Sequence, residues 1–461
     1  MGNDIIQVML SVLCSGHMLR KVNFTHIVLI PKVKNPTKMS DYRPISLYNV
    51  LYKMVSKCVA NRLKSILTMV VSDSQSAFVP GRLVTDNIIM AYEVLHCLKE
   101  KRSGRKGSMA IKLNMSKAYD RVEWGFLEQI MKKLGFDVRW INLMMECIST
   151  PSYVVLINGE PQGFISPSKG IRQGDLLSPY IFLLCTEGFS ALIRKAKRDK
   201  KLSGISISRG GPKLSHLLFA DDSLLFCQAK PEECRNLMAV LSLYEQSSSQ
   251  KINLDKTAIF FSKNTKENTR REIQGVWGSQ VILQYDRYLG MPAMVGRSKE
   301  RAFSGLKDRI ANKLQGWNEK FLSKVGREVL IKAVAQSIPT FTMSCFKLPM
   351  GFCEDVNAII AKFWWGSSSN RRKIYWKKWQ KLCTPKEEGG IGFRDFNAFN
   401  LALLGKQGWR FIRNPQSLVY RVCKAKYFPR CSFMECKLGT NPSLIWRSIL
   451  SARETIKNGM M

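Results

Sequence analysis

Two adjacent carboxylates are the residues best suited to do chemistry. Asp221 and Asp222 follow Phe219-Ala220 and lie between two apolar stretches, so we expect them at the tip of a hairpin. Neighbouring carboxylates repel each other, and their hard oxygen atoms suit Mg²⁺, which proteins usually hold through one or two carboxylates and substrate phosphates. In phosphoryl-transfer enzymes two such ions activate the attacking hydroxyl and support the leaving oxygen. An ordinary turn is the simpler alternative, because Asp is a common turn residue.

A polar loop bracketed by glycines is the second candidate. The sequence GIRQGDLLSP (170–179) leads into an apolar helix that we expect from Ser178 to about Lys195. Glycine allows a backbone to approach a ligand closely, and the start of a helix offers free N–H groups to phosphate. A capped helix entry without a ligand is the alternative for this loop taken alone.

The elements that must position these groups are a strand at Met109–Leu113 and a strand–turn–strand unit at Leu214–Cys227. The first strand is expected to open into a helix near Tyr119, which would contain Asp120. Elsewhere the patterns predict helices at 1–20, 47–70, 84–99 and 231–248, and long helices from about 299. They also predict strands at 26–30 and 153–158, a strand pair around 251–261, and loops at 31–44, 101–107 and 161–170.

The net charge indicates a polyanionic partner. The 461 residues include 72 Lys and Arg against 35 Asp and Glu, a formal charge of +37. Such an excess repels itself unless a polyanion neutralises it, and nucleic acid is the polyanion we favour over a membrane surface. Thirteen scattered cysteines and four histidines show no zinc-ligand spacing, which disfavours a structural zinc site.

Targeting signals are not apparent in the sequence. No apolar run reaches the roughly 18–20 residues that span a bilayer, and the N-terminal stretch does not match a signal peptide. We therefore expect no membrane association and a nuclear or cytoplasmic location.

Residues 363–381 interleave Trp and Tyr with Lys and Arg. Basic groups neutralise phosphates and aromatic faces stack on bases, so this segment is a candidate for nucleic-acid binding. The alternative is that the aromatic rings anchor a helical core while the charges face water.

A series of blocks, in order, resembles the reverse transcriptases of plant non-LTR (LINE-type) retrotransposons. They are IPKVKNPTKMSDYRPISLYNVLYKMVSKCVANRL (30–63), QSAFVPGRLVTDNI (75–88), KLNMSKAYDRVEW (112–124), GIRQGDLLSP (170–179), FADD (219–222), INLDKT (252–257) and YLGMP (288–292). Further matching segments are 316–341, FWWG (363–366) and 376–410. The resemblance covers the polymerase core and the region after it, without the endonuclease and ribonuclease H domains of full-length members, so autonomous transposition is not expected.

The resemblance implies an α+β right-hand polymerase fold of fingers, palm and thumb, followed by a mostly helical basic region. The expected division is a helical lead-in at 1–21, a reverse transcriptase domain at 22–292, a thumb-like region at 293–350 and a Trp-rich basic region at 351–461. The implied activity is RNA-directed DNA synthesis with Mg²⁺, or Mn²⁺ as the alternative ion. The implied partners are an RNA template, a DNA primer, their RNA–DNA hybrid and deoxynucleotide triphosphates.

The resemblance also implies roles for single residues. Asp221 and Asp222 match the catalytic, metal-binding pair. Tyr119 matches the residue beneath the sugar that rejects a 2′-hydroxyl. The expected substrate contacts are completed by Gln173, Gly174, Lys32, Arg43 and Lys256, the last as an aid to proton transfer to pyrophosphate.

One departure concerns the chemistry directly. Asn114 stands where the family has the first palm aspartate, the carboxylate that contacts both metal ions. Asn keeps the shape and loses the charge, and the nearby Asp120 is expected to be structural rather than a replacement. Milder departures are Lys169 for Arg, Leu176 for Pro and Ser249 for Gly. The alternative function is therefore a catalytically inactive, nucleic-acid-binding remnant of a retroelement.

Overall fold

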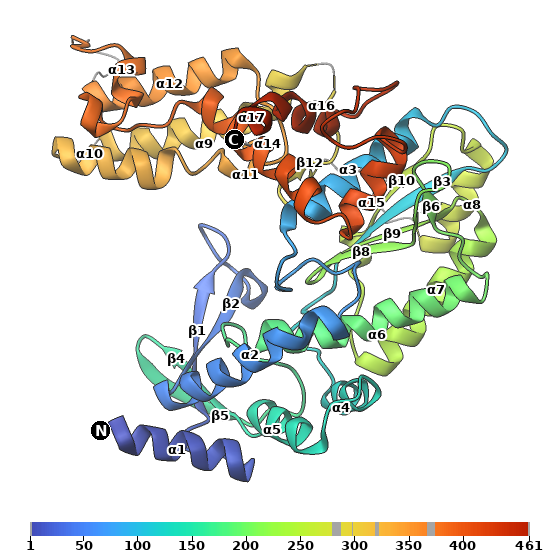
Figure 1. Cartoon of the computed structure of the whole chain (residues 1–461). Helices are drawn as coiled ribbons and strands as arrows, with labels where there is room; N and C mark the ends of the chain where they lie inside the picture. The colour runs from blue at the N-terminus through green and yellow to red at the C-terminus, as the bar shows by residue number, and fades with distance from the viewer. Residues whose placement is uncertain (1, 279–286, 297, 319–321, 367–373, 460–461) are drawn as a thin grey trace. The chain divides into compact units, whose positions relative to one another are not determined.

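The computed structural model describes residues 2–278, 287–296, 298–318, 322–366 and 374–459 (Figure 1). The chain divides into two compact units. Unit 1 comprises Met1–Asn87, Leu98–Ile205 and Lys213–Gln284, and unit 2 comprises Ile88–Cys97, Ser206–Pro212 and Tyr285–Met461. Within the described ranges, no helix is both long and apolar enough to cross a bilayer.

A four-stranded antiparallel sheet carries the two aspartates in unit 1. Its strand order is β10 (Ala258–Phe261), β3 (Ser108–Leu113), β9 (Asp222–Gln228) and β8 (His216–Phe219). Nearly every residue of β3 and β9 is buried, as expected for central strands rich in apolar side chains. The predicted strands at 109–113 and 214–227 are confirmed. The predicted strand pair at 251–261 is wrong, because η2 (Leu254–Lys256) precedes the single strand β10.

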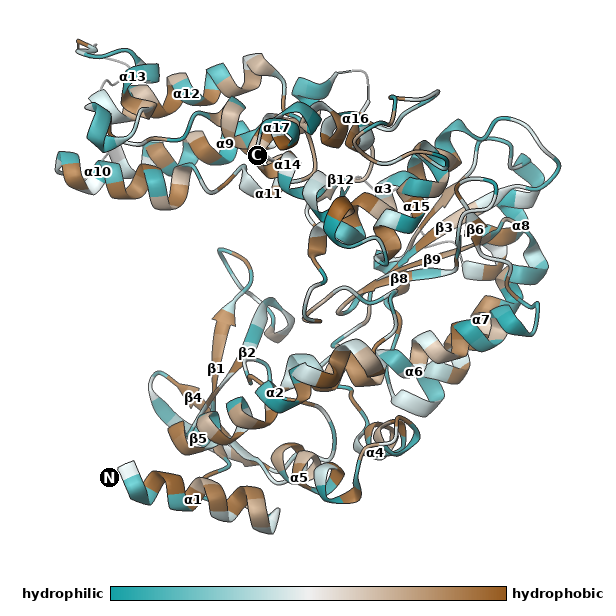
Figure 2. Ribbon diagram, in the orientation of Figure 1, coloured by the Kyte–Doolittle hydropathy of each residue, from teal (hydrophilic) through white to brown (hydrophobic). Residues whose placement is uncertain are grey.

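A second sheet in unit 1 has the order β2 (Tyr42–Tyr48), β1 (Phe24–Pro31), β4 (Ser152–Ile157) and β5 (Glu160–Ile165). β1 pairs with β2 antiparallel and with β4 parallel, and Figure 2 shows β1 as hydrophobic along most of its length. The strands predicted at 26–30 and 153–158 are confirmed. Two predictions are wrong: β2 occupies part of the expected loop and helix, and β5 occupies part of the loop expected at 161–170. β5 is exposed along its whole length, so neither face needs apolar side chains, and its sequence shows no apolar alternation from which a strand could be predicted.

The helices of unit 1 largely follow the predicted periodicity. Helix α2 (Val50–Val70) buries Tyr52, Val55, Val59 and Leu63 on one face, and the side chain of Asn49 caps it by accepting the Leu51 N–H at 2.9 Å. The others are α1 (Gly2–Ser15), α4 (Trp124–Lys133), α5 (Val138–Ser149), α6 (Ser178–Arg198), α7 (Pro231–Ser248) and α8 (Glu267–Trp277). Helix α3 (Val84–Glu100) contributes its residues 88–97 to unit 2.

One helix starts later than predicted. The chain leaves β3, forms turns through residues 116–121, and enters α4 only at Trp124. Asp120 therefore lies in a turn, and its predicted place in a helix is wrong. Hydrogen bonds from Ile171 and Gln173 hold this turn, and local periodicity could not reveal donors so far along the chain.

Unit 2 is mostly helical. Trp446 is fully buried and stacks on Tyr427 with ring centroids 4.4 Å apart and on Phe428 at 5.5 Å. The buried carboxylate of Glu93 accepts hydrogen bonds from Lys426 Nζ at 2.8 Å and from the Tyr427 hydroxyl at 2.7 Å. The elements are the β11 (Arg287–Tyr288) and β12 (Met291–Pro292) ribbon, α9 (Lys299–Asn318), α10 (Lys324–Leu330), η3 (Ile331–Ala335), α11 (Thr340–Met343), α12 (Met350–Trp365), α13 (Trp379–Cys383), η4 (Lys386–Glu388), α14 (Phe396–Arg413), α15 (Leu418–Tyr427), α16 (Leu444–Ser451) and α17 (Arg453–Asn458).

Candidate active site

The β8–β9 hairpin presents the two aspartates at one end of the central sheet (Figure 1). Phe219 pairs with Asp222, so Ala220 and Asp221 form the turn between the strands. Ala220 has a positive φ of 51°, and its N–H donates to Gln75 Oε1 at 3.2 Å. A left-handed conformation costs a residue with a Cβ about 1–2 kcal/mol. Strain of this kind is typical of functional turns.

Strand register brings Asn114 next to this turn. β3 and β9 are antiparallel, and their last pair is Leu113 with Ser223. Continuing the register by one residue sets Asn114 opposite Asp222, and directly opposed residues of antiparallel strands project from the same face. The carbonyl oxygen of Asn114 also accepts the Asn253 N–H at 2.8 Å, which fixes its backbone from the other side.

The aspartates share an electrostatic environment with two further side chains. Burial raises the pKa of Asp222, the charge of Asp221 raises it further, and Lys112 opposes both effects. Burial and then the charge of Asp221 raise the pKa of Tyr119 to about 12. Lys112, on β3, is a member of this group that the sequence reasoning missed; its place two residues before Asn114 was the available signal.

Tyr119 is held in place by stacking. Its ring lies 5.2 Å from the ring of Phe182, centroid to centroid, with only 14° between the planes. Phe182 is buried in α6, in the same core that α2 and α4 build. The turn that follows the palm strand is therefore anchored to a rigid helix.

The predicted Gln173–Gly174 loop lies against the Tyr119 turn. Gln173 Nε2 donates to Asp120 Oδ1 at 3.1 Å, and Ile171 N donates to the Tyr119 carbonyl at 2.9 Å. Gly174 has a φ of +100°, which requires glycine, and its carbonyl accepts from the Tyr48 hydroxyl at 3.1 Å. Asp120 thus orients Gln173, a structural role like the one the sequence indicated.

A buried charged network supports the same loop, and the sequence reasoning missed it. Arg172 and Asp175 flank Gln173–Gly174 and are each only 4% exposed. Arg172 Nη2 donates to Asn23 Oδ1 and to the Cys147 carbonyl, both at 2.6 Å. Asp175 Oδ2 accepts from the Tyr52 hydroxyl at 2.6 Å. The only sequence signal was a pair of opposite charges inside a loop that leads into an apolar helix.

The predicted basic contacts lie elsewhere in unit 1. Lys32 follows β1 and its Nζ donates to the Ser40 carbonyl at 2.8 Å, while Arg43 is exposed on β2 opposite Ile30. Arg43 belongs to the second sheet, and Lys32 lies just beyond the end of its strand β1. Lys256 is exposed at the end of η2, just before β10. Among the residues that the structure describes, these three cations form no ion pair or hydrogen bond with Asp221 or Asp222, so their predicted roles stay predictions.

The donor set fits a divalent cation in part. Two carboxylates at one turn suit Mg²⁺. The pKa of Asp222 is raised first by burial and then by the charge of Asp221, and a bound cation would oppose both effects. In the part of the chain that the structure describes, no group of three or more His, Cys, Asp or Glu side chains is placed to hold a metal ion. Asp221 and Asp222 would hold such an ion, with an amide at 114 in place of a third carboxylate.

Comparisons with known proteins place these elements in a family. The family described as reverse transcriptase (RNA-dependent DNA polymerase) matches residues 30–301, more than half of the chain. An uncharacterized mitochondrial protein of Arabidopsis thaliana is 47% identical over 126 residues, 27% of this chain and 82% of that protein.

Two longer relatives are named as products of mobile elements. The Transposon TX1 uncharacterized 149 kDa protein of Xenopus laevis is 25% identical over 404 residues, 85% of this chain and 29% of that protein. A retrovirus-related Pol polyprotein from the type-1 retrotransposable element R2 of Popillia japonica is 25% identical over 214 residues, 46% of this chain and 29% of that protein. The chain thus spans under a third of either protein. It belongs to the reverse transcriptase (RNA-dependent DNA polymerase) family, with that family's right-hand polymerase fold.

Proposed function

We propose that this chain is an RNA-directed DNA polymerase whose chemistry is impaired at Asn114. The observation that carries the proposal is the strained hairpin that presents Asp221 and Asp222 beside Asn114. In the proposed reaction the 3′ hydroxyl of a DNA primer loses its proton to water and attacks the α-phosphate of a deoxynucleotide. A new O–P bond forms, the bond from the α-phosphorus to the oxygen that bridges to the β-phosphate breaks, and pyrophosphate leaves. Bound Mg²⁺ or Mn²⁺ would supply Lewis-acid activation of the hydroxyl and stabilisation of the leaving oxygen.

The residues of this chain would bind the ions, the sugar and the template. Asp221 and Asp222 would hold the ions, and the stacked ring of Tyr119 would lie beneath the incoming sugar. Gln173 and Gly174 would pack against the nucleotide and template, held by Asp120 and the buried Arg172–Asp175 network. Lys32 and Arg43 are proposed to contact nucleotide phosphates or the template, and Lys256 is proposed to assist proton transfer to pyrophosphate.

Asn114 is expected to reduce the rate strongly. A charge that stabilises a transition state is worth about 10²–10³ in rate when one contact is lost, and a carboxylate shared by two ions should be worth at least that much. The test is primer extension on an RNA template with Mg²⁺, comparing the protein as it stands with Asn114→Asp. We expect synthesis to rise at least about 10²-fold in the variant.

Matched controls separate a restored ligand from an added charge. Asn158→Asp adds the same charge at an exposed turn of the other sheet and should change nothing. Asn114→Asp combined with Asp221→Asn should be inactive. Primer extension by the unaltered protein at the rate of Asn114→Asp would contradict the proposal and would point to another ligand, such as Asp120.

The second candidate function is nucleic-acid binding without synthesis. It is favoured by the formal charge of +37 and by the amide at position 114. Binding to phosphates releases counterions, so the affinity should fall steeply with salt. Filter binding of an RNA–DNA hybrid over a salt series, in the absence of nucleotides, measures this, and a flat response would contradict it. For either function we propose a nuclear or cytoplasmic location, nuclear by analogy with the family.

A further inference from the structure

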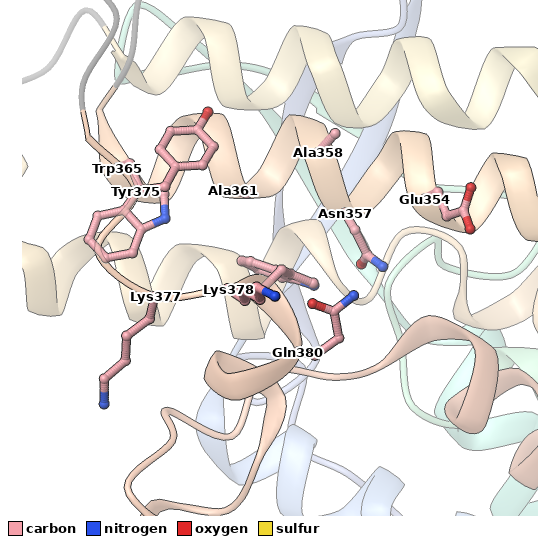
Figure 3. Close-up of a pocket in the computed structure, with 10 residues that line it drawn as sticks. Glu354, Asn357, Ala358, Ala361, Trp365, Tyr375, Lys377, Lys378 and Gln380 are labelled. Atoms are coloured by element: carbon pink, nitrogen blue, oxygen red, sulfur yellow. The ribbon is translucent and has the colours of Figure 1, made fainter.

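A pocket in unit 2 lies outside the polymerase site. It has a volume of about 390 Å³ and opens between helix α12 and the segment 374–380 (Figure 3). Glu354 and Asn357 of α12, Trp365 at its end, and Tyr375, Lys378 and Gln380 of the segment are among its lining residues. A volume of this size falls in the usual range for small-ligand pockets.

Four aromatic residues of this region form two pairs with different roles. Trp364 is 7% exposed, and Trp379 stacks on the buried ring of Phe393 at 5.1 Å, so these two anchor the core. Trp365 and Tyr375 instead stack on each other at the mouth of the pocket, with centroids 6.0 Å apart and 19° between the planes. Tyr375 remains 50% exposed. An exposed ring in a stacked pair offers a flat apolar face to another planar ring.

The opposite side of the pocket is polar. Figure 3 shows the side chains of Asn357 and Gln380 pointing toward one another. Asn357 Oδ1 is buried and has no hydrogen-bond partner among the residues that the structure describes. A buried acceptor without a partner is costly, because it has lost its water without a replacement. This atom is out of reach of solvent, whereas the exposed Gln380 amide offers a ligand both a donor and an acceptor.

The charge around the pocket is positive. Lys377 and Lys378 line it, and Lys324 Nζ lies 4.9 Å from the centroid of the Trp365 ring. Glu354 is the one acidic residue among the ten that are known to line it. Lysines beside aromatic faces form the arrangement that grips a phosphate backbone while a base stacks on a ring.

We propose that this pocket takes one base of a single-stranded nucleic acid. The base stacks on the face of Tyr375 that Trp365 leaves free, its edge bonds the Gln380 amide, and Lys377 and Lys378 contact the flanking phosphates. Stacking tolerates any base, so the site holds a strand without reading its sequence. The inference rests on the proposed function only in that the chain binds nucleic acid, and it adds a second contact outside the polymerase site.

The test uses the full chain and short single strands, oligouridine as RNA and oligothymidine as DNA, each with one 2-aminopurine. Tyr375→Ala should weaken binding at least about fivefold, the lower end for loss of one stacked base, and should abolish the 2-aminopurine quenching that stacking produces. Tyr375→Phe keeps the ring and should bind like the unaltered protein. Trp409→Ala removes an aromatic ring, 41% exposed, on α14 outside the pocket and should change nothing.

The outcomes separate this inference from the proposed function. If the unaltered protein binds neither strand, the proposal that this chain binds nucleic acid is wrong, and the pocket proposal is wrong with it. If it binds but Tyr375→Ala binds equally well, the pocket is not the site, whatever primer extension shows with Asn114→Asp. Tighter binding of oligouridine would assign the pocket to the template, and tighter binding of oligothymidine would assign it to a DNA strand; either supports a base in the pocket.

Discussion

The buried pair Arg172–Asp175 gives the sharpest test of how the Gln173 loop is held. Replacing Arg172 with Met removes the guanidinium and leaves the Asp175 carboxylate buried, 4% exposed, with the Tyr52 hydroxyl and the Leu177 N–H as donors. It also removes the donors to Asn23 Oδ1 and the Cys147 carbonyl. Breaking a buried ion pair from one side typically costs about 3–5 kcal/mol, since the remaining charge is uncompensated.

A matched control shows why distance alone does not set this magnitude. Lys132 and Glu128 approach to 2.6 Å on α4, against 3.8 Å for Arg172 Nε and Asp175 Oδ2, yet their side chains are 46% and 37% exposed. An exposed pair of this spacing contributes only about 0.3–0.5 kcal/mol. Lys132→Met should therefore cost roughly a tenth of what Arg172→Met costs.

Urea unfolding followed by circular dichroism measures both variants against the unaltered protein. The double variant Arg172→Met with Asp175→Leu removes both charges and should be more stable than Arg172→Met alone, because no buried charge is left without a partner. Equal losses in Arg172→Met and Lys132→Met would refute the argument from burial. In the Asn114→Asp background, Arg172→Met should also lower the rate of primer extension, because the loop that carries Gln173 loses its support.

Three further predictions concern unit 1. Ser249 follows α7 at a φ of 56° and its hydroxyl donates to Glu123 at 3.2 Å. Ser249→Gly should change the stability of unit 1 by less than about 1 kcal/mol, because the strain that it relieves and the hydrogen bond that it removes are of similar size. Ser248→Gly, inside the helix, relieves no strain and should lower the stability measurably in the same urea titration. Burial, and then the charges of Arg194 and Lys197, lower the pKa of His216 from 6.5 to about 3. Between these two pH values the unfolded chain binds a proton at His216 and the folded chain does not. Stability should then fall as the pH drops from 6.5 towards 3, by up to about 1.4 kcal/mol per pH unit, and a His216→Gln variant that kept the whole of this slope would refute the assignment. The pKa of Asp222 is raised in the folded chain, so ionisation of this carboxyl lowers the free energy of unfolding as the pH rises above the ordinary carboxyl pKa of about 4. Asp222→Asn should therefore unfold at a higher urea concentration than the unaltered protein at neutral pH. A difference of the same size below a pH of about 4 would contradict this cause.

Much of the fold could be predicted from local patterns. The hairpin at 216–228, strand β3, and helices α3 and α7 lie where apolar periodicity and turn residues indicated. These elements bury a continuous apolar face or stripe, so their signal is contained within each segment. The identity of Asn114 and its place at the end of a palm strand were also visible in the sequence, because they depend on residue type and order alone.

Tertiary structure decided the features that depend on partners far along the chain. β5 is a strand because β4 offers it hydrogen bonds, although all six of its residues are exposed. Asp120 lies in a turn because the chain there is bound to residues 170–173. The Arg172–Asp175 network is formed by groups more than a hundred residues away at Asn23 and Tyr52. A sequence lists such donors and acceptors, but only the fold determines which of them are buried together, and burial is what makes their pairing matter.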